Sequence, residues 1–102
     1  MRAIRRNNIS WTIEKCIDLI SKEPTIQDCK IVKHADDVAM GDNFSITIDG
    51  LEVFVYLPNF QYDDFFIYFD FFAETVHEEF ASFFDVLECL VGYSDNGVII
   101  YQ

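Results

Sequence analysis

The chain has 102 residues, of which 51% are hydrophobic and 17% aromatic, and this composition predicts one ordered domain over residues 1–102. No apolar run approaches the roughly 18 residues of a membrane-spanning helix, and the N-terminal segment lacks the apolar stretch of a secretory signal. The three cysteines, Cys16, Cys29 and Cys89, form no Cys-x-x-Cys pair. We therefore expect reduced thiols, a cytoplasmic protein and no metal site.

Charge is distributed unevenly along the chain, whose formal net charge is −11. All seven Lys and Arg residues lie within positions 1–33, whereas positions 34–102 hold fourteen Asp and Glu and no Lys or Arg. Two interpretations stay open: the acids keep an aromatic-rich domain soluble, or they are complementary to a strongly basic partner. Direct binding to DNA or RNA is disfavoured, because few phosphates could be neutralised.

The N-terminal part predicts a basic head, a helix, a weak strand and a loop. Residues 1–8 contain three Arg residues and should be flexible or fold back onto the acidic body. Residues 9–23 repeat apolar side chains at helical spacing, and Pro24 ends that helix. Residues 25–33 fit an edge strand whose Lys residues discourage pairing with other chains. Residues 34–42 predict a solvated acidic loop without the pattern of a calcium site.

Residues 43–72 form the predicted centre of the fold. Asp49-Gly50 lies between two alternating apolar runs, and Asp-Gly supplies the positive φ angles of a two-residue type I′ turn. Pro58 cannot donate a hydrogen bond between strands and so ends the second strand. A third strand follows from Phe65. The expected cross-strand pairs of the hairpin are Ile48 with Leu51, Ile46 with Val53, and Phe44 with Val55.

The second face of this predicted sheet combines aromatic rings with acids. Alternation places Phe54 and Tyr56 of one strand beside Phe66, Tyr68 and Asp70 of the next. A large exposed aromatic patch is rare on a monomer, so another segment of the chain, a second copy or a different partner should cover these rings. Stacking of nucleic-acid bases on such a sheet is disfavoured by the negative charge.

A second helix is predicted to begin at Thr75 and to end at Gly92. Thr75 and Glu78 match the capping box, and an apolar stripe continues to Val91. Like charges one turn apart weaken a helix by about 0.2–0.5 kcal/mol per pair, so its acidic face favours a positively charged partner. That face carries Glu78, Glu79, Asp85 and Glu88. A turn over 94–97 and a final strand over 98–102 complete the predicted elements.

No arrangement of residues in the sequence predicts an enzyme. His34 and His77 have no Ser or Cys nucleophile at a recognisable spacing, and adjacent acids such as Asp63 and Asp64 diverge on a regular element. The four glycines form no phosphate-binding loop. We expect no catalytic residue and no cofactor.

These elements give the order helix, four strands, helix, strand. That order predicts an α+β domain, with a small antiparallel sheet of four to five strands and two helices packed on it.

The acidic, aromatic-rich surface and the missing catalytic groups favour an inhibitor that binds a basic nucleic-acid-binding enzyme, by blocking its active site or by imitating the charge of DNA. These properties resemble in type those of toxin immunity proteins and of phage-encoded nuclease inhibitors, including anti-CRISPR proteins. The resemblance implies a basic protein partner, with no direct nucleic acid and no membrane. The expected contact residues are Glu74, Glu78, Glu79, Asp85, Glu88, Tyr62, Asp63, Asp64, Tyr68 and Asp70.

A second resemblance leads to a different class. An N-terminal amphipathic helix, an antiparallel sheet and a second long helix in an acidic protein of this size are similar in layout to the type III secretion chaperones, over residues 9–102. That similarity implies a homodimer that holds an effector segment extended along the sheet. Monomer and homodimer therefore both stay open.

Overall fold

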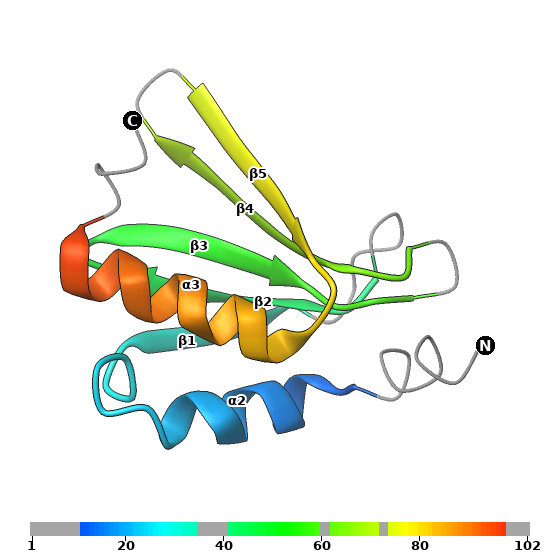
Figure 1. The fold of residues 1–102 in the computed structure, drawn as a ribbon, viewed down its shortest axis with the longest axis horizontal. Coiled ribbons are helices and arrows are strands. Elements are labelled where there is room, and N and C mark those ends of the chain that lie inside the picture. Colours follow the sequence, from blue (N-terminus) through cyan, green and yellow to red (C-terminus); the bar gives the residue numbers. More distant parts are fainter. Residues whose placement is uncertain (1–10, 35–40, 60–61, 72–73, 98–102) are drawn as a thin grey trace.

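The computed structural model describes residues 11–34, 41–59, 62–71 and 74–97. In these residues, one twisted antiparallel sheet with the strand order β1-β2-β3-β4-β5 packs against two helices (Figure 1). The predicted α+β class, with its antiparallel sheet and two helices, is confirmed. The elements are α2 (Ile13–Ser21), β1 (Lys30–His34), β2 (Asn43–Ile48), β3 (Leu51–Tyr56), β4 (Phe65–Phe71), β5 (Glu74–Phe80) and α3 (Phe83–Asn96).

The β2–β3 hairpin forms as the sequence predicts. Asp49 and Gly50 have φ angles of 51° and 81°, which a type I′ turn requires at both central positions. The strands pair Ile48 with Leu51, Ile46 with Val53 and Phe44 with Val55. Strand β3 ends at Tyr56, just before Pro58.

The two helices lie side by side and run in the same direction across one face of the sheet. At their starts, the ring of Trp11 lies 5.5 Å from that of Phe83. At their far ends, the Ser94 hydroxyl donates to the Thr25 carbonyl oxygen over 3.4 Å. The core between helices and sheet contains Ile13, Cys16 and Ile20 of α2, Phe44, Ile46, Val53, Val55, Phe65, Ile67 and Phe69 of the sheet, and Phe83, Val86, Leu87, Leu90 and Tyr93 of α3.

The boundaries of the N-terminal elements differ from those predicted. Helix α2 begins at Ile13, because the Thr12 side chain caps it by accepting a hydrogen bond from the Lys15 N–H. The expected edge strand over 25–33 is only partly formed: residues 24–28 form turns, and β1 covers Lys30–His34. Residues 1–10 and 35–40, which include the basic head and most of the acidic loop, lie outside the described residues.

The prediction of a helix starting at Thr75 is wrong, because Glu74–Phe80 is strand β5. It pairs with β4 over its whole length, from Phe71 opposite Glu74 to Phe65 opposite Phe80. Thr75 does not cap a helix; its hydroxyl donates to Asp70 over 2.8 Å. Helix α3 begins at Phe83, where the Ser82 hydroxyl accepts a hydrogen bond from the Asp85 N–H.

The end of α3 also lies further along the chain than predicted. Gly92 is inside the helix, which continues to Asn96 and includes part of the expected turn over 94–97. Gly97 ends it with a φ of 84°, and its N–H donates to the Tyr93 carbonyl oxygen. The predicted final strand over 98–102 lies outside the described residues.

Candidate functional site

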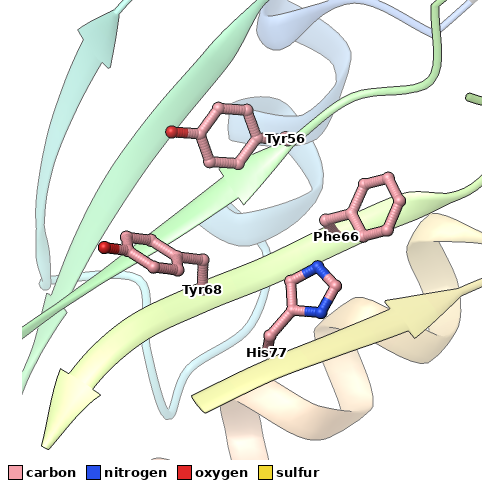
Figure 2. Close-up of a pocket in the computed structure, with 4 residues that line it drawn as sticks. All are labelled: Tyr56, Phe66, Tyr68 and His77. Atoms are coloured by element: carbon pink, nitrogen blue, oxygen red, sulfur yellow. The ribbon is translucent and has the colours of Figure 1, made fainter. Parts of the chain in front are cut away.

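The sheet has an outer face, which we define as the face turned away from α2 and α3. Strand β3 contributes Tyr56 to this face, β4 contributes Phe66 and Tyr68, and β5 contributes His77. Figure 2 shows these four side chains on the same side of the sheet, with the helices behind the strands. They line a pocket of about 260 Å³. We call this pocket the aromatic hollow.

Ring contacts hold the walls of the aromatic hollow in place. Phe66 is 8% exposed, and the His77 ring stacks on it with centroids 5.1 Å apart and an interplanar angle of 18°. Tyr62 meets Phe66 edge to face at 5.4 Å. On the other side, Tyr68 lies 6.0 Å from Phe54. Because the rings support one another across three strands, the hollow is preorganised.

Carboxylates lie on the outer face beside the aromatic hollow. Glu79 is paired with Phe66 across β4 and β5, and it lies two residues after His77 on the same side of its strand. Asp70 follows Tyr68 by two residues and accepts a hydrogen bond from Thr75. Among the described strands, Lys30 on β1 is the one Lys or Arg whose register places it on the outer face. The hollow therefore lies in a negative field.

The structure brings only some of the predicted contact residues together. Four of them surround the aromatic hollow: Tyr62, Tyr68, Asp70 and Glu79. Asp63 and Asp64 are half-buried just before β4. Glu74 is exposed and Glu78 half-buried, on the same β5 strand as Glu79.

The predicted unbroken acidic helix face is wrong, since its residues belong to two elements. Glu78 and Glu79 lie on β5, whereas Asp85 and Glu88 are exposed on α3. Helix α3 packs against the core face of the sheet, opposite the aromatic hollow, so these two acids do not border the hollow.

A second pocket lies on that helical side, with a volume of about 310 Å³. The apolar stripe predicted for the second helix includes Phe84, but this residue is 61% exposed at the pocket, whereas its neighbour Phe83 is buried. The other lining residues are Glu23, Leu87, Glu88 and Val91. Like-charged Glu23 and Glu88 disfavour the pairing of two copies through this pocket.

His77 lines the aromatic hollow, but it is not among the contact residues predicted from the sequence. A helix that begins at Thr75 would hold His77 in its first turn, whereas strand β5 turns its ring onto Phe66. Two-residue alternation over Thr75, His77 and Glu79 was the signal that could have found it.

A histidine, a serine and a glutamate also meet on the outer face. The Ser45 hydroxyl donates to Glu52 over 2.7 Å, and His34 Nε2 lies 3.2 Å from the same oxygen. Since Ser45 has a single proton and gives it to Glu52, its oxygen accepts from His34. A nucleophilic serine needs the opposite arrangement, with its proton directed at the histidine. Ser45 is also 1% exposed, so this cluster is structural.

The thiols are poor nucleophiles. Burial, with a smaller effect of the Glu14 charge, raises the pKa of Cys16 to about 12, and Cys89 is buried in α3. Burial and the Asp49 and Asp28 charges also raise the pKa of Cys29. Within residues 11–34, 41–59, 62–71 and 74–97, no three His, Cys, Asp or Glu side chains form a group that could hold a metal ion.

Comparisons of the chain with protein-family models, curated proteins and solved structures find no match. In the part of the chain that the structure describes, no helix is long and apolar enough to cross a membrane.

Proposed function

We propose that this chain is a cytoplasmic protein-binding inhibitor, without catalytic activity of its own, that neutralises a basic nucleic-acid-binding enzyme such as a toxin or phage-targeted nuclease. One observation carries the proposal: the outer face combines an open aromatic hollow with the carboxylates of Asp70 and Glu79. From β2 to α3 the sequence supplies no Lys or Arg to neutralise them.

The physical basis is complementarity of charge and of contact type. Enzymes that act on nucleic acids neutralise phosphates with Lys and Arg, and an acidic surface attracts such a partner and speeds its association. Aromatic side chains then supply the anchors on which protein interfaces depend. The acidic charge would therefore raise the association rate, and the aromatic rings would hold the partner in the complex.

The test is capture of proteins from a lysate of the native host at low salt, followed by mass spectrometry. The hairpin variant combines Asp70→Asn and Glu79→Gln, which neutralise two exposed carboxylates on the outer face of β4 and β5. We expect wild type to retain a basic nucleic-acid-binding enzyme and to inhibit it, and the hairpin variant to retain much less.

A matched control removes the same amount of charge elsewhere. It combines Asp28→Asn and Asp49→Asn, both exposed and outside β4 and β5; Asn also tolerates the positive φ at position 49. The control should capture the enzyme as wild type does. If the hairpin variant and the control both captured less enzyme to the same extent, net charge and not the outer face would explain the binding, which would contradict the proposal. Capture of no basic enzyme by wild type would overturn it as well.

The secretion-chaperone function is the alternative, and the aromatic outer face favours it to a lesser degree. A row of rings on a sheet can hold an extended apolar segment of a partner. Light scattering and salt dependence separate the two functions: a chaperone should be a dimer whose binding changes little with salt, whereas an electrostatic inhibitor loses association rate as salt rises.

A further inference from the structure

We propose that the aromatic hollow binds a guanidinium group, and that an arginine side chain of the basic partner inserts there. This inference deepens the proposed function and rests on it for the source of the arginine, but the site can be tested without the partner.

The size of the aromatic hollow suits one side chain. Its volume is about 260 Å³, below the range of about 300–1,000 Å³ in which pockets enclose drug-sized ligands. The four lining side chains come from β3, β4 and β5, so the site is built on strands and does not depend on a loop. A single long side chain from a docked protein can enter it while the partner covers the surrounding sheet.

The lining of the aromatic hollow fits a planar cation. Ring faces carry negative potential and attract cations, and guanidinium groups stack on aromatic rings better than a compact, strongly hydrated ammonium does. The stacked rings of Phe66 and His77 form one wall, and the rings of Tyr56 and Tyr68 lie across from it, with both hydroxyls directed away from that wall (Figure 2).

The surrounding charge selects a cation over the other candidate ligands. Glu79 lies opposite Phe66, and Asp70 lies on the same strand face as Tyr68. A carboxylate or phosphate ligand would be repelled by both acids, and an apolar side chain would gain nothing from them. Lys30, the basic residue on this face of the described strands, lies on β1 at the far edge of the sheet from β5.

The experiment titrates the isotope-labelled protein with three short glycine-flanked peptides while recording its NMR spectrum. The peptides carry one arginine, one lysine or one citrulline, which keeps the shape of arginine but lacks its charge. We expect the arginine peptide to shift the ring resonances of Tyr56, Phe66, Tyr68 and His77. The lysine peptide should bind more weakly and the citrulline peptide least.

Variants then locate the site. A cation on one exposed ring gains about 0.5–1 kcal/mol, so Tyr68→Leu should weaken binding of the arginine peptide roughly two- to fivefold. Tyr56→Leu serves as a second variant if Tyr68→Leu fails to fold. Phe84→Leu is the matched control, since it replaces an exposed aromatic ring on α3, and it should bind the peptide as wild type does.

Each outcome decides something. Equal binding of arginine and citrulline peptides, no shifts at the hollow, or equal weakening by Tyr68→Leu and Phe84→Leu would overturn the guanidinium site. If the peptide binds as expected but no basic enzyme is captured from lysate, the proposed function fails and the site stands. If an enzyme is captured equally by wild type and Tyr68→Leu, the arginine inference fails and the proposed function stands.

Discussion

The imidazole of His77 and the ring of Phe66 stack across β5 and β4, with centroids 5.1 Å apart. Aromatic pairs contribute about 0.5–1.5 kcal/mol beyond buried area. His77→Ala should therefore lower the free energy of unfolding by about that amount, because it also exposes more of Phe66. His77→Phe keeps a stacked ring and should stay within a few tenths of a kcal/mol of wild type. Urea unfolding measures both, and equal destabilisation by the two substitutions would contradict a contribution from stacking.

The start of α3 gives a second prediction. Ser82→Ala removes the oxygen that accepts the Asp85 N–H and should cost about 0.5–2 kcal/mol. Thr75→Ala removes only an exposed hydrogen bond to Asp70 and should cost well below 1 kcal/mol, about the low end for a hydrogen bond. Thermal unfolding of both variants compares them. A larger loss for Thr75→Ala would instead support a helix that begins at residue 75.

Two glycines should respond in opposite ways to the same substitution. Gly50 has a φ of 81° and no atom within 4 Å of an added Cβ, so Gly50→Ala should destabilise by roughly 1–2 kcal/mol through the backbone alone. Gly92 lies inside α3 with equally open space around it. Gly92→Ala should stabilise by about 0.5–1 kcal/mol. Urea unfolding measures the change in the free energy of unfolding for each substitution. Destabilisation by Gly92→Ala would mean that the helix ends at residue 92.

Cys16 gives a prediction about pH. Its thiol is buried in α2, and burial raises the pKa from 9.0 to about 12. The neutral thiol is favoured in the folded state, so its contribution to stability is fully present below pH 9 and is lost as pH rises from there toward 12. Cys16→Ala should lower stability at neutral pH by leaving a cavity, but its stability should then fall less steeply with alkaline pH than that of wild type. Urea unfolding at a series of alkaline pH values gives the free energy of unfolding of both proteins. If that free energy fell equally steeply with pH for wild type and for Cys16→Ala, the titration of Cys16 would be contradicted.

The sequence predicts the β2–β3 hairpin because two independent signals agree there. Asp49-Gly50 specifies the turn, and the alternation of apolar residues on either side specifies the same register. The second aromatic face follows from that register, which is why Tyr68 and Asp70 could be named in advance. Whether the face is open depends on where the helices pack, and alternation along a strand carries no information about that.

The error over residues 74–80 has a physical cause. Val76 and Phe80 are four residues apart, and this spacing puts them on one side of a strand as well as of a helix. Glu-rich sequence favours a helix, and the Phe72-Ala73 pair before β5 has no Gly or Asn to signal a hairpin turn. Pairing with the seven residues of β4 decides in favour of the strand. That tertiary contact is not visible in a local pattern.

The association rate of the captured basic enzyme, measured against ionic strength for wild type and the hairpin variant, tests the central claim most directly. Charges on the outer face should make the wild-type rate fall steeply as salt rises, since screening removes steering. The hairpin variant should start slower and fall less steeply, and the matched control should follow wild type. A wild-type rate that does not change with salt, or a hairpin variant with the wild-type slope, would contradict an acidic surface that recruits a basic partner.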